Sequence, residues 1–187
     1  METAERLITA DEYLAREFDD RFTELINGRV VVNQPLIPHQ TIVGRIHLAL
    51  GNWVNAAAGR GYAWLPLDTK IDDYNVLAPD IVWVAQAHLP PRGSKYMVHP
   101  PDLVVEVRSP STWNRDVGVK KSLYERHGVR ELWLVDDRSS SVLRYRRTSE
   151  DVVGFDEGQE VAAPDTLSSS QLPGLELDLS ALFAPAF

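Results

Sequence analysis

The sequence contains no cysteine, so disulfide bonds, zinc–thiolate sites and cysteine nucleophiles are all excluded. It also lacks an apolar run of the roughly 18 to 20 residues that a membrane-spanning helix needs. The N-terminal segment is acidic and has no apolar stretch of the kind found in secretory signals. From these absences we expect a cytoplasmic protein without a membrane segment.

Basic residues are absent from residues 148–187, which carry eight acidic side chains. Residues 1–107 carry nine basic and 14 acidic side chains, whereas residues 108–147 carry ten basic and five acidic ones. The formal net charge of −8 by itself argues against a protein that binds nucleic acid mainly through charge. The basic central stretch leaves two interpretations open, a solvated arginine-rich face or a surface that attracts phosphate groups.

The chain has 187 residues, 44% hydrophobic and 25% charged, which predicts one globular domain. Asn27-Gly28 between two β-branched runs predicts a hairpin, and an expected crossover helix between two later strands indicates a mixed sheet. The expected helices span about residues 10–16, 38–58 and 117–127; the expected strands lie at 22–26, 29–32, 62–65, 69–71, 81–84, 103–107, 132–135 and 142–145. A short strand and a terminal helical turn are expected in the tail.

Two carboxylates stand at or within apolar strands. Glu106 lies inside the run 103–107, where a buried carboxylate is costly unless it is paired or binds a metal. Strand alternation places Arg108 on the same face, so a Glu106–Arg108 ion pair is one interpretation. Asp80 directly precedes the strand 81–84; if the two strands are neighbours, both carboxylates can converge around a cation. Oxygen ligands without cysteine favour Mg²⁺ or Mn²⁺.

Lys120 is a third candidate because it lies near the start of the expected helix 117–127. A lysine beside metal-bound carboxylates can polarise a water or stabilise developing negative charge. A solvated pair formed with Lys121 is the alternative, although the positive end of a helix dipole disfavours cations there. Tyr124 follows Lys120 by four residues, so both side chains are expected on one helix face.

Residues 100–112, PPDLVVEVRSPST, resemble the hallmark motif of the Uma-two family of bacterial restriction endonuclease-like proteins. The pattern continues through ELING at 24–28, His39, Pro79-Asp80, RDVGVK at 115–120, Leu123-Tyr124, Gly128-Val129 and ELWLVD at 131–136. This resemblance covers about residues 9–146 and implies the PD-(D/E)XK nuclease-like superfamily. The implied fold is α/β (α+β), a restriction-endonuclease-like central mixed β-sheet flanked by helices, with an N-terminal helix and β-hairpin.

The resemblance also implies the extent of the domain. We expect a single PD-(D/E)XK nuclease-like domain over residues 1–187. Its core would cover about residues 9–146, and residues 147–187 would form an acidic C-terminal extension.

The same resemblance implies roles for individual residues. Asp80 and Glu106 match the two metal-binding acids, with Glu24 and the carbonyl of Val107 completing the ligand set. The superfamily usually has a lysine two residues after the second acid; that position is Arg108 here, and Lys120 matches a lysine moved to the following helix. Ser109 and His39 are expected to contact substrate or to support the site. The basic central stretch adds Arg108, Arg115 and Arg126 as expected phosphate contacts, and the polar loop 111–114 beside the proposed site adds Trp113 as an expected substrate contact.

The function expected from these residues is that of a Mg²⁺- or Mn²⁺-dependent endonuclease that hydrolyses phosphodiester bonds, with double-stranded DNA as substrate and a homodimer as assembly. Two alternatives remain. One is a nuclease-like fold kept as an inactive nucleic-acid-binding or regulatory module. The other is a hydrolase of small phosphoesters. A groove with arginines on both sides would favour nucleic acid, and a closed pocket would favour a metabolite.

Overall fold

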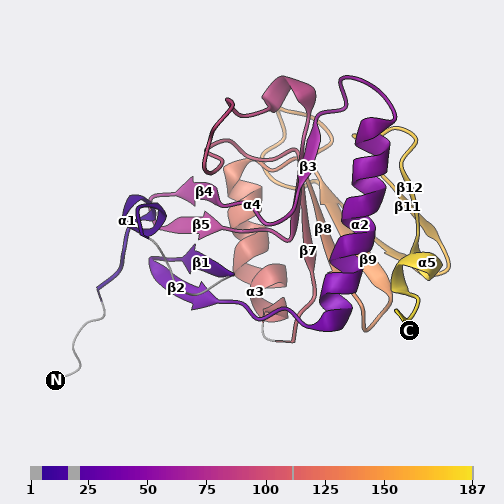
Figure 1. Cartoon of the computed structure of the whole chain (residues 1–187), viewed down its shortest axis with the longest axis horizontal. Coiled ribbons are helices and arrows are strands. Elements are labelled where there is room, and N and C mark those ends of the chain that lie inside the picture. Colours follow the sequence, from indigo (N-terminus) through magenta and orange to yellow (C-terminus); the bar gives the residue numbers. More distant parts are fainter. Residues whose placement is uncertain (1–5, 17–21, 111, 187) are drawn as a thin grey trace.

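A computed structural model describes residues 6–16, 22–110 and 112–186. A six-stranded mixed sheet, in the order β10-β9-β8-β7-β6-β3, forms its centre (Figure 1). The strands are β3 (Tyr62–Trp64), β6 (Ile81–Val84), β7 (Leu103–Val107), β8 (Glu131–Asp136), β9 (Ser141–Arg146) and β10 (Glu157–Ala162). Only β7 and β8 run parallel, so the predicted mixed sheet is confirmed.

A second, smaller sheet carries the N-terminal elements. Its order is β2-β1-β5-β4, and the strands are β1 (Thr23–Ile26), β2 (Arg29–Val32), β4 (Thr69–Asp72) and β5 (Asn75–Leu77). Asn27 and Gly28 both have positive φ, as the two central residues of a tight hairpin turn require, so the predicted hairpin is confirmed. The short helix α1 (Ala10–Leu14) begins with a capping box between Thr9 and Glu12.

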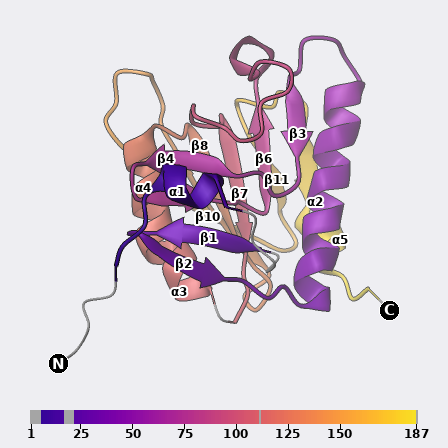
Figure 2. The same cartoon turned by 60° about the vertical axis from the view of Figure 1, so that its left-hand side comes forward.

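The central sheet is covered on both faces, and strand alternation decides which side chain meets which helix. Leu103, Val105 and Val107 pack in the cluster that contains α2 (Ile37–Asn55). Val104 packs in the cluster that contains α4 (Lys121–His127), and Figure 2 shows α2 and α4 on opposite sides of the sheet. Glu106 alternates with Val105 and Val107 and therefore faces the side of α4.

The crossover between β7 and β8 is helical over a longer stretch than predicted. It consists of α3 (Trp113–Arg115), a π-helical segment at Asp116–Lys120, and α4. The expected helix start at residue 117 is therefore wrong, and Lys120 lies in the middle of the helical stretch. Because Lys120 does not lie at a helix N-terminus, the helix dipole does not disfavour its positive charge. Helix α2 also ends earlier than predicted, at Asn55 instead of near Gly59.

The acidic tail packs against the α2 side of the central sheet. It contains β11 (Thr166–Ser168), β12 (Glu176–Asp178) and α5 (Leu179–Phe183), close to α2 in Figure 1. The leucines of this segment share one hydrophobic cluster with α2 and β7: Leu167, Leu172, Leu175, Leu177, Leu179 and Leu182. The expected tail strand and terminal turn are confirmed, while β5, β10 and β11 were not predicted. Within the described residues, no helix combines the length and apolarity needed to cross a membrane.

Candidate active site

Asp80 and Glu106 come together through the antiparallel pairing of β6 and β7. Ile81 pairs with Val105, so the next positions outward along the two strands are Asp80 and Glu106. The Asp80 carboxylate accepts a hydrogen bond from the backbone N–H of Val107 at 2.8 Å. Both carboxylates line one cavity of about 680 Å³ between the smaller sheet and α2, a volume typical of small-molecule and cofactor sites.

Lys120 is the positive centre of this cavity. Its Nζ lies 2.6 Å from Oε1 of Glu106, 2.9 Å from Oε1 of Glu24 and 3.4 Å from Oδ1 of Asp116. All four residues are 3% exposed or less. The Glu106–Arg108 ion pair considered above is absent, because Arg108 bonds instead to Asp136 on the neighbouring strand β8. We call Glu24, Glu106, Asp116 and Lys120 the acid–lysine cluster.

The pKa values of this cluster reflect burial and mutual charge. Burial raises the pKa of Glu106 well above its usual range, Lys120 opposes that rise, and the neighbouring carboxylates add to it. The pKa of Asp116 is likewise raised by burial, with Lys120 and a hydrogen bond from Thr112 acting against the rise. Burial alone would lower the pKa of Lys120, but Glu106, Glu24 and Asp116 outweigh it and raise that pKa well above normal. The lysine therefore stays an ammonium ion throughout the physiological range.

Hydrogen bonds fix each carboxylate of the cluster. The Tyr124 hydroxyl donates to Oε1 of Glu106, which confirms that Tyr124 and Lys120 share a face. Glu24 accepts from the backbone N–H of Ala78 at 3.0 Å and from the side-chain amide of Asn33 at 2.8 Å. Oε1 of Glu24 thus meets both Ala78 and Lys120 while Oε2 accepts from Asn33, and metal binding by Glu24 stays a prediction.

His39 lies against Asp80. Its Nε2 is 3.1 Å from Oδ2 of Asp80, so this nitrogen donates to the carboxylate. The other ring nitrogen, Nδ1, is buried and has no hydrogen-bond partner within the described part of the chain. His39 lines the cavity, and Nδ1 is a buried polar atom that this structure leaves unpaired.

The remaining predicted contacts divide into two groups. Ser109 lines the cavity beside Thr112, whose hydroxyl donates to Asp116 at 2.7 Å. The other four residues, Arg108, Arg115, Trp113 and Arg126, do not line the cavity. Of these, Arg108 lies over the ring of the half-buried Trp113, Arg115 donates to Asn33 at 3.0 Å, and Arg126 is exposed on α4.

Several cavity residues were missed in the sequence. Asp116 could have been recognised from its spacing of four residues before Lys120. Arg16 lies just after α1, Asp68 and Lys95 lie on loops, and no local pattern connects these three residues with Asp80 and Glu106. Burial, and secondly the charge of Glu24, raises the pKa of Asp68.

The donor set fits a hard divalent cation in chemistry and in charge. Three carboxylates of the cluster face one ammonium group, which leaves a formal excess of negative charge, and Asp80 adds another carboxylate nearby. A divalent cation would offset this excess. Among residues 6–16, 22–110 and 112–186, no group of three or more His, Asp or Glu side chains is already arranged as a metal site.

The chain is similar to known proteins in family and in fold. A family model described as "Uma2: Putative restriction endonuclease" matches residues 10–180. The fold is similar to the crystal structure of a protein from Anabaena variabilis ATCC 29413, titled a "putative nuclease belonging to DUF820". That similarity has a TM-score of 0.79 and 23% sequence identity, and it covers 94% of this chain and 97% of the other. No curated protein matched the chain.

Proposed function

Because the chain belongs to the Uma2 restriction endonuclease family, we propose that it is a metal-dependent endonuclease that hydrolyses phosphodiester bonds in DNA. Family and fold support nuclease activity; the metal and the DNA substrate are our proposal. The observation that carries it is the convergence of Asp80, Glu106 and Lys120 on one cavity. Two carboxylates and a lysine are the groups that metal-assisted phosphodiester hydrolysis needs.

In this proposal Asp80 and Glu106, with the carbonyl of Val107, hold one Mg²⁺ or Mn²⁺. Such an ion, when bound, polarises a phosphate oxygen and lowers the pKa of a coordinated water. Glu106 accepts from Lys120 and Tyr124 through Oε1, so Oε2 remains for an ion. Glu24 contacts Lys120 and is itself held by Asn33 and Ala78, so we assign it the role of positioning the lysine.

The chain's own groups then act on the phosphate. The Lys120 ammonium stabilises the negative charge that develops as water adds to phosphorus and the bond to the leaving oxygen breaks. His39 and the N–H of Val107 orient Asp80 through Oδ2. Tyr124 orients Glu106 in the same way. These contacts hold the two carboxylates in place before substrate arrives, which is the condition for efficient catalysis.

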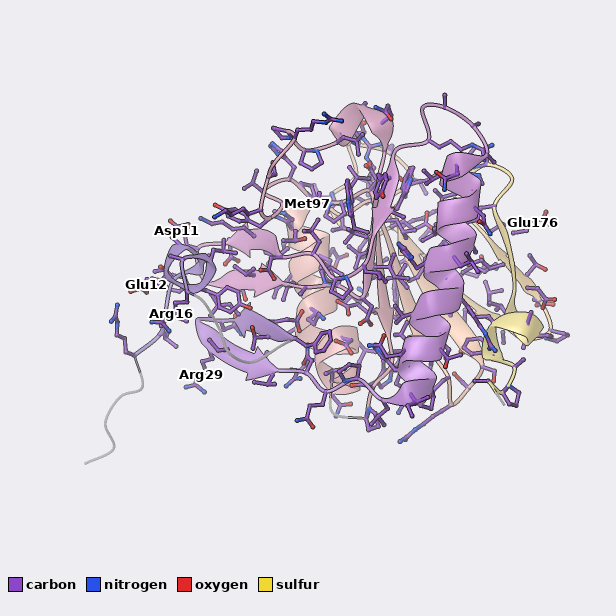
Figure 3. All side chains as sticks on the ribbon, viewed as in Figure 1. Asp11, Glu12, Arg16, Arg29, Met97 and Glu176 are labelled. Carbon is purple, nitrogen blue, oxygen red and sulfur yellow. The ribbon has the colours of Figure 1, made fainter. Side chains whose placement is uncertain are left out.

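A plasmid assay tests the proposal. Purified protein is incubated with supercoiled plasmid, single-stranded DNA and RNA in Mg²⁺, Mn²⁺ or EDTA, alongside the Glu106→Ala and Lys120→Ala variants. Cleavage should need a divalent ion and should fall by about 100-fold or more in both variants. Glu176→Ala and Lys121→Ala are matched controls, because Glu176 lies on the far side of the molecule (Figure 3) and Lys121 stacks on Tyr145. Cleavage that survives in Glu106→Ala would refute the site.

One observation favours a second candidate, a hydrolase of small phosphoesters. The catalytic groups are recessed in a cavity whose volume would also suit a metabolite. This candidate would be supported if the protein hydrolysed a small phosphodiester and did not cleave plasmid or oligonucleotide.

A further inference from the structure

We propose that the substrate reaches the acid–lysine cluster as an unpaired DNA strand. Its bases would pack against an apolar rim formed by Phe22, Leu65 and Pro66, and its phosphates would contact Arg16 and Lys95. This inference rests on the proposed nuclease function and names the substrate class of the same site. We call these five residues the cavity rim.

The depth of the catalytic groups is the first argument. Glu106 and Lys120 are 3% and 2% exposed, and the side chain of Asp80 is 19% exposed. A scissile phosphate must therefore enter the cavity to meet them. Base pairing and stacking hold each strand of a duplex against its partner, so moving one phosphate inward requires local deformation of the duplex. A strand that is already unpaired bends freely and avoids that cost.

The apolar rim is the second argument. Phe22 is 48% exposed and Leu65 is 46% exposed, and both line the same cavity as the acid–lysine cluster together with Pro66. Large apolar side chains beside a charged catalytic centre are suited to a ligand that combines charged and apolar parts. An unpaired nucleotide is such a ligand, because its phosphate is charged and its base presents an uncovered π-face.

The distribution of available positive charge is the third argument. Most arginines of the basic stretch 108–147 are paired within the molecule; Arg130 bonds to Glu150 and Arg146 to Glu157. Arg16 and Lys95 are exposed and line the cavity, and their side chains form no hydrogen bond or ion pair with the described part of the chain. Figure 3 shows Arg16 next to α1, at the side of the smaller sheet. Two available cations at one opening suit a short strand better than a long duplex face.

Binding by fluorescence anisotropy tests the inference directly. The probe is a fluorescein-labelled strand of roughly 12 nucleotides, alone or annealed to its complement, added to the full chain carrying Asp80→Asn so that cleavage does not interfere. The single strand should bind about tenfold more tightly than the duplex. Leu65→Ser should weaken binding of the single strand by about fivefold or more, and Lys95→Ala should also weaken it.

Two exposed residues outside the cavity provide controls. Leu48→Ser removes an apolar side chain on α2 that is 64% exposed, and Arg92→Ala removes an exposed cation. Neither should change binding of the single strand.

Equal binding of duplex and single strand, or equal effects of Leu65→Ser and Leu48→Ser, would overturn the inference. If the wild type cuts duplex DNA faster than single strands, the inference fails while the nuclease proposal stands. If it cuts neither, the nuclease proposal fails. The binding comparison then still shows whether the cavity rim binds a single strand in preference to a duplex.

Discussion

At the scale of single residues, the acid–lysine cluster combines three buried carboxylates with one buried ammonium group. Such a cluster is poorly suited to stabilising a fold, because burying each charge costs free energy that the ion pairs only partly return. Glu106 illustrates this, since its pKa is raised by burial despite the adjacent lysine. A costly arrangement of this kind is typical of functional sites.

Replacing Lys120 by methionine removes the cluster's only cation and leaves its carboxylates uncompensated. We expect the free energy of unfolding to fall by about 3–5 kcal/mol at pH 8. Lys120 opposes the rise in the pKa values of Glu106 and Asp116, so its removal raises both further and the folded variant takes up protons more readily than the wild type. The loss should therefore be smaller at pH 5. Urea unfolding at both pH values measures the difference, and an equal loss at both would contradict the account.

Tyr124→Phe tests the hydrogen bond to Glu106 while keeping the ring. The phenol is fully buried, so its removal takes one of two donors away from the buried Glu106 carboxylate and should cost about 1–3 kcal/mol. The rate of DNA cleavage should fall as well, because Glu106 loses one of its two orienting donors. Tyr145→Phe is the control, since the ring of Tyr145 contacts Lys121 and Phe155. Similar stability of the two variants in urea would show that the Glu106 contact contributes nothing.

How far these residues could be predicted from sequence depends on whether their partners lie close in the chain. Asp80 and Glu106 were predictable because apolar strand residues surround them. The partner of Arg108 was not predictable. Arg108 meets Asp136 because the preceding residues, Val107 and Val135, pair between β7 and β8. Long-range register of this kind is not encoded in a local pattern.

At the scale of elements, the helical crossover brings Lys120 and Tyr124 to the face of β7 that carries Glu106. The predicted helix contained the right residues, but its start was placed too late because Ser-Thr-Trp-Asn at 111–114 has the composition of a loop. The strand β10 was missed for a related reason. β10 reads EGQEVA and is mostly exposed, so it lacks the apolar alternation that identifies a half-buried strand.

His127 in the last turn of α4 makes stability depend on pH. Burial lowers its pKa, although Asp72 and a backbone hydrogen bond to Ile71 act in the other direction. Protonation is thus more favourable in the unfolded chain, so this contribution to stability is present above about pH 6.5 and is lost as pH falls through the lowered pKa. His127→Asn should therefore reduce the loss of stability between pH 7 and pH 5. Unchanged pH dependence in thermal unfolding would contradict this assignment.

Gly61 directly precedes β3 and allows its backbone to approach the backbone of Val84 and Ala85 closely. Its φ is +74°, and a Cβ there would lie 1.9 Å from the carbonyl oxygen of Val84. Gly61→Ala should therefore lower the free energy of unfolding by more than about 1 kcal/mol. Gly44→Ala is the matched control within α2, where a Cβ meets nothing within 4 Å. It should stabilise the helix by about 0.5–1 kcal/mol. Equal melting temperatures for the two variants would refute this difference.

At the scale of the whole molecule, two sheets and α2 enclose one cavity, and the family match over residues 10–180 includes most of the acidic tail. The tail's leucines share the core with α2, which explains why a segment that is acidic on its surface is integral to the fold.

The expected homodimer remains a proposal; light scattering of the purified chain would determine its mass in solution. The net charge of −8 is compatible with the proposed function, because phosphate recognition is assigned to a few residues at one opening.

The most direct test of the central claim is the rate of plasmid nicking by Asp80→Asn relative to wild type, in Mg²⁺ and at equal folded concentration. Asparagine keeps the size of the side chain and its acceptor for the N–H of Val107, so the change removes charge with little effect on packing. We expect the rate to fall by about 100-fold or more. A rate within about twofold of wild type would show that the cavity at the ends of β6 and β7 is not where the phosphodiester bond is cut.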